Sequence, residues 1–178
     1  DRANPPAPGG ILFTGDSDIR FWTFEDRFAS DFAGLPVLNR GFGGARTWES
    51  LIYFPETVLP SRPRLIVFCC GDNDIATLGE PGVESAVNGF MYFMDLVFGQ
   101  APSVKRILYL GIHPSPGDEP LWGFIAKANV RLRRFCEGSG LAEFVDFSHL
   151  LLDARGRPRA DCFLPDRMHF NPPFYARL

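Results

Sequence analysis

The amino-acid sequence predicts an α/β protein in which a parallel sheet lies between two layers of helices. Short apolar runs alternate along the chain with longer segments of helical periodicity, which is typical of successive strand–helix–strand units. The apolar runs are also continuous rather than alternating with polar residues, as expected of strands that helices cover on both faces. At 178 residues, the chain has the length of one domain with a substantial core.

Continuous apolar runs supply the expected strands. In chain order they are Ile11–Thr14, Pro36–Asn39, Leu65–Cys70, Arg106–Gly111 and Glu143–Asp146. Ligands of open parallel sheets bind beyond the carboxyl ends of the strands. The residues that follow these runs are therefore the candidate functional positions.

The segments between the strands carry the helical pattern. The expected helices are Asp18–Phe32, Thr47–Phe54, Val83–Phe98 and Leu121–Glu137. The third shows the helical period most clearly, and a glycine pair around Ser139 ends the fourth. Residues 1–10 are rich in Pro and Gly and are expected to form a loose lead-in. No linker or repeat divides residues 11–178, so we expect a single domain there.

Bulk properties exclude several classes of function. The net charge of −3 argues against a surface for nucleic acid or anionic membranes. No apolar run approaches the roughly 18 residues of a membrane span. The cysteines lack the spacing of a redox or zinc site, and we expect buried free thiols, which slightly favour the cytoplasm. A secreted or periplasmic location stays open if a signal peptide has been removed.

The two ends of the chain hold the residues of a nucleophilic site. Ser17 follows the first apolar run, and Asp166 and His169 stand near the carboxyl end. A serine hydroxyl needs an imidazole to take its proton, and the imidazole needs a carboxylate to fix its tautomer. The spacing of Asp166 and His169 lets one short turn join their side chains. Ser17 taken alone is better explained as a helix cap, and Asp166 taken alone also fits a turn residue.

Two further segments complete an ordered set. Asn39-Arg40-Gly41-Phe42-Gly43-Gly44 follows the second run, and Gly71-Asp72-Asn73-Asp74 follows the third. With Gly15-Asp16-Ser17 and the Asp-x-x-His pair, the chain resembles the SGNH (GDSL-type) hydrolase superfamily, in particular its small single-domain bacterial members. The resemblance spans nearly the whole chain. It departs at Asp18, where many members have Leu, Ser or Thr, and at Ala45-Arg46, where many have Asp and then Thr or Ser.

The resemblance implies a fold, an activity and roles for particular residues. The fold is a flavodoxin-like three-layer αβα sandwich with a five-stranded parallel sheet in the order 2-1-3-4-5. Ser17 is implied as nucleophile, His169 as base and Asp166 as orienting carboxylate, while Gly44, Asn73 and the N–H of Ser17 form the oxyanion hole. A glycine lets the backbone N–H approach the reacting carbonyl, and the asparagine side chain adds another donor.

Some polar residues remain as weaker candidates. Arg46 and His113 are candidate substrate contacts, because each follows a candidate strand end or the oxyanion glycine, and Trp48 has no assigned role. Gly41 and Gly43 are expected to be flexible turn residues. Asp72 and Asp74 offer oxygen ligands but lack the spacing of a calcium loop, so we expect no metal site. The proposed chemistry needs no cofactor.

The function expected from the sequence is hydrolysis of a small-molecule carboxylic ester through an acyl-enzyme on Ser17. A small acyl group such as acetyl is favoured by the similarity to small bacterial members. A lysophospholipase or thioesterase acting on longer chains is the alternative within the same class. A non-catalytic binding domain on the same fold is the alternative outside it. Neither the alcohol or sugar part of the substrate nor the oligomeric state can be deduced from this sequence.

Overall fold

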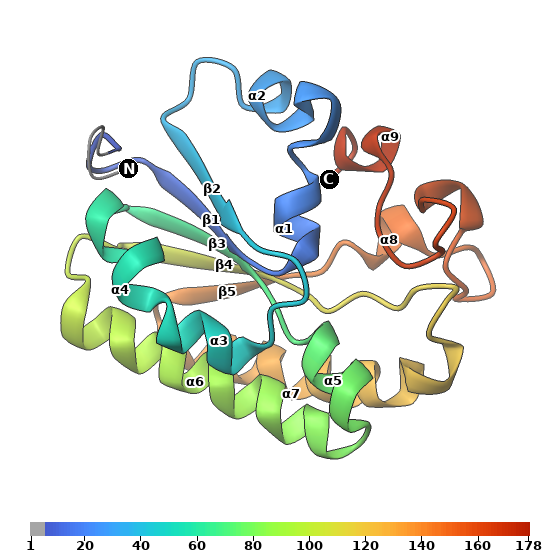
Figure 1. Cartoon of the computed structure of the whole chain (residues 1–178). Helices are drawn as coiled ribbons and strands as arrows, with labels where there is room; N and C mark the ends of the chain where they lie inside the picture. Colours follow the sequence, from blue (N-terminus) through green and yellow to red (C-terminus); the bar gives the residue numbers. More distant parts are fainter. Residues whose placement is uncertain (1–5) are drawn as a thin grey trace.

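The computed structural model describes residues 6–178, and its centre is a parallel sheet (Figure 1). The strand order across the sheet is β2-β1-β3-β4-β5, and every neighbouring pair is parallel. The predicted three-layer α/β architecture and its 2-1-3-4-5 order are therefore confirmed. The strands are β1 (Ile11–Gly15), β2 (Val37–Gly41), β3 (Leu65–Cys69), β4 (Arg106–Leu110) and β5 (Ala142–Val145).

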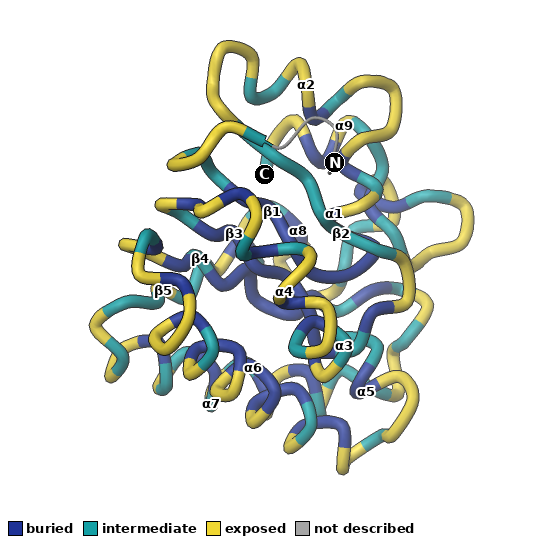
Figure 2. Tube along the Cα trace, turned by 60° about the vertical axis from the view of Figure 1, so that its left-hand side comes forward, coloured by how far each residue is buried: buried dark blue, intermediate teal, exposed yellow. Residues whose placement is uncertain are grey.

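One face of the sheet is covered by the two longest helices, α6 (Pro81–Gln100) and α7 (Trp122–Ser139), and by the shorter α3 (Thr47–Ile52) and α4 (Phe54–Thr57), all of which lie below the sheet in Figure 1. Their apolar sides meet Leu12, Phe68 and Tyr109 in one buried cluster, and the ring centroids of Phe90 and Tyr109 lie 4.5 Å apart. Figure 2 shows the result as a dark interior with exposed outer helix faces.

Short helices cover the opposite face and lie above the sheet in Figure 1. They are α1 (Ser17–Phe21), α2 (Arg27–Asp31), α8 (Ser148–Leu151) and α9 (Pro172–Tyr175). Short 3₁₀ turns occupy Phe24–Asp26, Leu59–Ser61, Glu119–Leu121 and Ala160–Cys162. A second buried cluster unites Phe13 with Trp22 and with Phe170 near the other end of the chain. The two ends of the chain thereby share one core.

The first predicted helix, Asp18–Phe32, was wrong as a continuous element. The chain breaks after α1, and Glu25 and Asp26 adopt left-handed conformations with φ of 55° and 56°. In an unbroken helix Trp22 and Phe28 would point roughly 120° apart, because successive residues rotate by about 100°. The break lets both rings pack edge-on against Phe13, at 5.6 and 4.9 Å. Aromatic packing on the sheet thus overrides local helical periodicity.

Other differences concern short segments. The sequence did not predict α5 (Asp72–Leu78), a mostly polar helix that fully buries Ile75. The expectation of a flexible turn was wrong at Gly41, which ends β2. A Cβ there would lie 2.5 Å from the backbone nitrogen of Arg20, so a glycine is needed for α1 to approach. Of the expected loose lead-in, residues 1–5 lie outside the described part. Within residues 6–178, no helix combines the length and apolarity needed to cross a membrane.

Candidate active site

The candidate site lies where the carboxyl ends of β1, β2 and β3 meet the segment that precedes α9. Ser17 is the first residue of α1, and it is buried. The cap of this helix is Asp16, whose Oδ1 accepts the N–H of Asp18 at 3.0 Å. Because Asp16 caps the helix, the Ser17 hydroxyl is available for other contacts.

Ser17, His169 and Asp166 form one hydrogen-bonded chain. The Oγ of Ser17 lies 3.1 Å from Nε2 of His169, although the two residues are 152 positions apart. The Nδ1 of His169 lies 2.7 Å from Oδ2 of Asp166. The structure therefore brings together all three residues that the sequence singled out for nucleophilic chemistry, in the order nucleophile, base, carboxylate.

A tight turn brings Asp166 and His169 together. The second carboxylate oxygen of Asp166 accepts the backbone N–H groups of Met168 and His169 at 2.9 and 3.0 Å. Partial burial acts to raise the pKa of Asp166, but the hydrogen bonds from His169 and from these backbone groups outweigh it and lower the pKa. The carboxylate is thus ionised in the neutral range and suited to stabilise an imidazolium.

Aromatic side chains flank the imidazole. The Phe21 ring meets the His169 ring edge-on at 4.5 Å, and Phe24 stacks on Phe21 at 4.6 Å. Phe24 and Met168 are 41% and 48% exposed. The His169 ring therefore contacts an ionised carboxylate at Nδ1 and an aromatic side chain at its edge.

The two oxyanion candidates lie on loops that contact each other. Gly44 has φ of +73°, a conformation that favours glycine. The amide nitrogen of Asn73 donates to the carbonyl of Ala45 at 3.1 Å and to Oδ1 of Asp72 at 3.0 Å. The first bond ties the loop after β2 to the first turn of α5, so both candidates are fixed relative to each other.

The buried carboxylate of Asp74 also stabilises the loop after β2. Asp74 is fully buried, and its Oδ2 accepts both the N–H and the hydroxyl of Thr47, at 2.8 and 3.0 Å. Its Oδ1 accepts the hydroxyl of Ser85 on α6. Asp72 instead faces Asn73 and the carboxyl of Asp16. Asp72 and Asp74 thus have separate protein partners and do not converge on one point.

Arg46 and Trp48 stand beside the oxyanion loop. The guanidinium of Arg46 lies 5.1 Å from the Trp48 ring centroid, and its backbone N–H bonds Glu49 at 2.9 Å. The Trp48 side chain is 40% exposed. The two residues form a cation–π pair near Gly44, and contact of Arg46 with substrate stays a prediction.

His113 does not lie at the rim of the cleft, where the sequence placed it. Its ring is buried, with Nε2 at 2.8 Å from Oδ2 of Asp18 and Nδ1 at 3.4 Å from the carbonyl of Pro114. The Phe170 ring packs on it at 4.1 Å. As a substrate contact, His113 is therefore not supported by its position.

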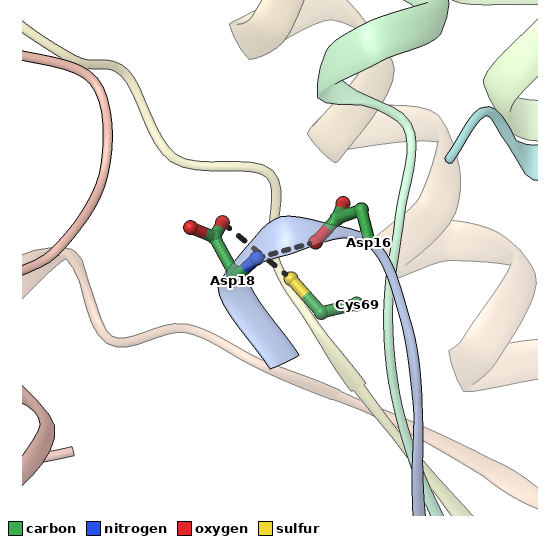
Figure 3. A group of neighbouring side chains, drawn as sticks. All are labelled: Asp16, Asp18 and Cys69. Atoms are coloured by element: carbon green, nitrogen blue, oxygen red, sulfur yellow. Dashed lines mark hydrogen bonds between the residues drawn. The ribbon is translucent and has the colours of Figure 1, made fainter. Parts of the chain in front are cut away.

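Asp16, Asp18 and Cys69 gather around the start of α1 (Figure 3). Their ligand atoms lie within 4.8 Å of one another, which is the spacing of a metal site. The facing atoms already have protein partners, because Asp16 caps α1 and Asp18 Oδ2 bonds both His113 and, at 4.0 Å, the Cys69 thiol. Burial and the neighbouring carboxyls raise the pKa of Cys69, which keeps the thiol protonated. The donor set therefore suits a hydrogen-bonded cluster and not a cation.

The sequence analysis missed the roles of Asp18, Asp74 and Tyr175. Asp18 was noted only as a departure from the family pattern, and its pairing with His113 joins residues 95 positions apart. Tyr175 donates from its hydroxyl to the Asp18 carbonyl at 2.7 Å. The available signal was chemical: a charged residue just after a candidate nucleophile needs a partner when buried.

A hollow of about 300 Å³ opens at the ends of β4 and β5. Its walls are mainly apolar and come from the loop after β4, from α7 and from the segment around α8; they include Ile112, Ile125, Phe144 and Phe147. His113 lines it, but Ser17, Asp166 and His169 do not. The hollow is therefore separate from the hydrogen-bonded triad.

The comparisons with known proteins agree with this geometry. The profile of the GDSL-like Lipase/Acylhydrolase family matches residues 14–177. No curated protein sequence matches the chain significantly. Similar solved structures include a Streptococcus pneumonia protein provisionally assigned as a platelet activating factor, with a TM-score of 0.81 and 22% identity over 96% of this chain and 80% of that one.

Two further solved structures share the fold at lower identity. A GDSL-like lipase from Bacteroides thetaiotaomicron has a TM-score of 0.75 and 18% identity, over 93% of this chain and 81% of that chain. Axe2, an acetylxylan esterase from Geobacillus stearothermophilus, has a TM-score of 0.72 and 16% identity, over 98% of this chain and 94% of that chain. These similarities establish the fold and leave the substrate open.

Proposed function

Since the chain belongs to the GDSL-like Lipase/Acylhydrolase family, it is an ester- or acyl-hydrolysing enzyme, and we propose that Ser17 is its nucleophile. The observation that carries the proposal is the chain of contacts from Ser17 Oγ to His169 Nε2 and from His169 Nδ1 to Asp166. A serine is activated in this way when a neighbouring base removes its proton. His169 is the base and Asp166 holds its tautomer.

The proposed reaction has two halves. Ser17 Oγ attacks the ester carbonyl carbon while His169 Nε2 takes the hydroxyl proton. The tetrahedral adduct then loses the alcohol, whose oxygen receives that proton from His169, and an acyl-Ser17 ester remains. A water molecule, deprotonated by His169, attacks this ester, and collapse of the second adduct releases the acid and restores the Ser17 hydroxyl.

The proposed oxyanion donors are the N–H groups of Ser17 and Gly44 and the side-chain amide of Asn73. Ser17 is the first residue of α1, where a helical N–H has no acceptor within the helix. Asn73 can release its bond to Asp72 Oδ1, because that oxygen also accepts the Asn73 backbone N–H at 2.7 Å. Donors aimed at the developing charge contribute roughly 3–4 kcal/mol each.

Within this activity, we favour a small acyl group such as acetyl. A long acyl chain needs an apolar channel that is continuous with Ser17. The hollow of about 300 Å³ does not supply one, because its lining stops at His113 and excludes the triad. The loop after β4 also packs against the turn of the base, with the Gly117 N–H bonding the Arg167 carbonyl at 3.0 Å. This loop therefore covers one side of the turn that carries His169.

The alternative of a longer acyl chain draws on the exposed apolar side chains near the base. Phe24, which stacks on the Phe21 ring next to His169, and Met168, which directly precedes His169, present such surface. A chain lying on these residues would be bound on an open surface and not in a channel. The sequence alternatives of a lysophospholipase or a thioesterase both require this mode of binding.

Covalent labelling tests the nucleophile. A fluorophosphonate should modify Ser17, and Ser17→Ala should abolish both labelling and hydrolysis of p-nitrophenyl acetate. Ser50→Ala is the matched control, because Ser50 is equally buried and its hydroxyl has no hydrogen-bond partner. Modification of another serine in active protein would refute the assignment. A series of p-nitrophenyl esters from acetyl to palmitoyl then separates the two substrate classes, and the proposal expects the highest kcat/KM for the shortest acyl groups.

A further inference from the structure

The residues that follow the nucleophile and the base meet at one buried side chain. Asp18 follows Ser17, and Phe170 follows His169. His113 contacts both: its Nε2 bonds Asp18 Oδ2 at 2.8 Å, and its ring packs on Phe170 at 4.1 Å. Tyr175 closes the same cluster by donating to the Asp18 carbonyl at 2.7 Å. A single imidazole thus links the two halves of the triad.

This contact is isolated from solvent. The side chains of His113 and Asp18 are 6% and 7% exposed. The space enclosed between them, Asp16, Asp72 and the thiol of Cys69 is too small for a water molecule. Without water to fill gaps or screen charge, movement of either partner leaves a buried charge unpaired, which costs several kcal/mol. The geometry of the pair is therefore strongly fixed.

The charge state of His113 is consistent with an ion pair. Burial alone would lower the pKa of His113, but the carboxylate of Asp18, the hydrogen bond to it and the charge of Asp72 raise it to about 9. The protonated ring can donate through both nitrogens, to Asp18 and to the carbonyl of Pro114. The backbone just before His113 is also held, because the Asn129 side chain accepts the N–H of Ile112 at 2.9 Å and donates to its carbonyl at 2.6 Å.

We propose that the Asp18–His113 ion pair is a positioning device that sets the distance between Ser17 Oγ and His169 Nε2. The inference rests on the proposed function, because it takes these two atoms as nucleophile and base. Asp18 anchors the start of α1, Phe170 follows the base directly, and His113 fixes the separation of the two. Neither Asp18 nor His113 touches the reacting atoms. A misplacement of about 1 Å between reacting groups can cost about 10²-fold in rate.

The test uses Asp18→Asn, His113→Gln and the double variant, with Tyr109→Phe as control. Tyr109 is fully buried and donates to the Cys70 carbonyl at 2.6 Å, so its variant loses a buried hydrogen bond outside the proposed device. With p-nitrophenyl acetate, each single variant should lose about 10-fold or more in kcat with little change in KM. Fluorophosphonate labelling of Ser17 should slow by a similar factor. The double variant should resemble the singles, because the two residues act as one unit.

The pH profile provides a readout that a purely structural pair would not change. In the wild type, kcat should fall as pH rises past about 9, because His113 loses the charge that holds Asp18. The double variant should lack this decline and be slow throughout. The double variant keeps every other titratable or charged group around His113, so the difference between the two kcat–pH profiles reports on the ion pair. These groups are Asp16, Asp72, Cys69, Cys70, Tyr175 and, across the hollow, Arg133 and Asp146.

Each outcome decides the inference. If the folded variants keep kcat and the labelling rate within about two-fold of the wild type and lose only thermal stability, the pair is structural and the inference is wrong. If the single variants do not fold, two other measurements decide the inference. One is the kcat of the double variant, which leaves no unpaired charge, and the other is the predicted fall of wild-type kcat above about pH 9. A wild-type kcat that stays flat to pH 10 overturns the inference. Failure of the wild type to label at Ser17 overturns the proposed function and, with it, the inference.

Discussion

At the scale of single residues, two Asp–His pairs in this chain have opposite characters. Asp166 and His169 are three positions apart, partly exposed and directly joined to Ser17. Asp18 and His113 are 95 positions apart, buried and one step removed from the chemistry. A partly exposed imidazole can exchange protons readily with water, whereas the buried ion pair keeps its charges until the pH approaches the raised pKa of His113, about 9. The environments therefore favour turnover at the first pair and positioning at the second.

Asn73→Ala should lower kcat by about 10²–10³-fold with little change in KM, because one donor to the oxyanion is removed. The protein should fold, although the loop after β2 loses the bond from Asn73 to Ala45. Steady-state kinetics with p-nitrophenyl acetate measure both parameters, and circular dichroism checks the fold. A kcat near the wild-type value would make Asn73 a structural residue only.

Asp166→Asn should cut the rate by about 10²–10⁴-fold, because the imidazolium formed during attack loses its carboxylate. The amide oxygen can still accept the N–H groups of Met168 and His169, so the turn should keep its shape. The pKa of Asp166 lies below its usual range. Protonation of this carboxylate should therefore reduce wild-type activity only at a lower pH than an ordinary aspartate would require. A kcat–pH profile of both proteins tests this. An unchanged rate in the variant would remove Asp166 from the mechanism.

At the scale of elements, the site depends on how closely α1 packs against β2. Asn39 bonds the carbonyl of Ile19 at 2.6 Å, and Gly41 lies directly beneath α1. A Cβ at Gly41 would stand 2.5 Å from the nitrogen of Arg20 and 2.7 Å from Cβ of Ile19. The absence of a side chain at one position of β2 therefore determines where α1 carries Ser17.

Gly41→Ala should destabilise the protein by about 1–3 kcal/mol, because the added methyl group forces α1 outward. It should also reduce kcat, since Ser17 moves with α1. Gly99→Ala is the matched control: nothing lies within 4 Å of its Cβ position near the end of α6, and alanine there should stabilise by about 0.5–1 kcal/mol. Denaturant unfolding and kinetics of both variants test the prediction. Equal stability of the two variants would contradict it.

At the scale of the whole molecule, the two faces of the sheet have different tasks. The face that α6 and α7 cover carries a large core of aliphatic and aromatic side chains. The other face joins residues from both ends of the chain, including those next to Ser17 and His169, the proposed nucleophile and base. Because folding of this face is what assembles the triad, the stability of its buried pairs is linked to activity.

Stability should fall between about pH 6.5 and pH 9 more in the wild type than in His113→Gln. The folded state raises the pKa of His113, so its contribution is complete below the unfolded value of about 6.5 and is lost as pH rises through about 9. Its total is on the order of 3 kcal/mol. Urea unfolding at several pH values measures the difference, and the other buried groups cancel in the comparison. Parallel pH dependences would show that His113 is neutral in the folded protein.

Much of the site could be read from the sequence because its parts are local. Ser17 and Asn73 follow apolar strands, and parallel strands bring their carboxyl ends to one edge by necessity. Asp166 and His169 need only one turn to meet. The family resemblance of the ordered blocks predicted the order of the strands. The periodicity of apolar residues was sufficient to predict the three-layer architecture.

The features that only the tertiary structure determined depend on contacts between segments that are far apart in the sequence. Periodicity predicted an unbroken helix through Trp22 and Phe28, but both rings need the same partner, Phe13, and the chain breaks to supply it. No local pattern joins Asp18 to His113, since their meeting depends on where the loop after β4 crosses the start of α1. Local chemistry, periodicity and the family resemblance of the ordered blocks therefore identified the candidate residues of the site. Packing of side chains far apart in sequence determined how they are held, because only a folded core makes a buried charge find its partner.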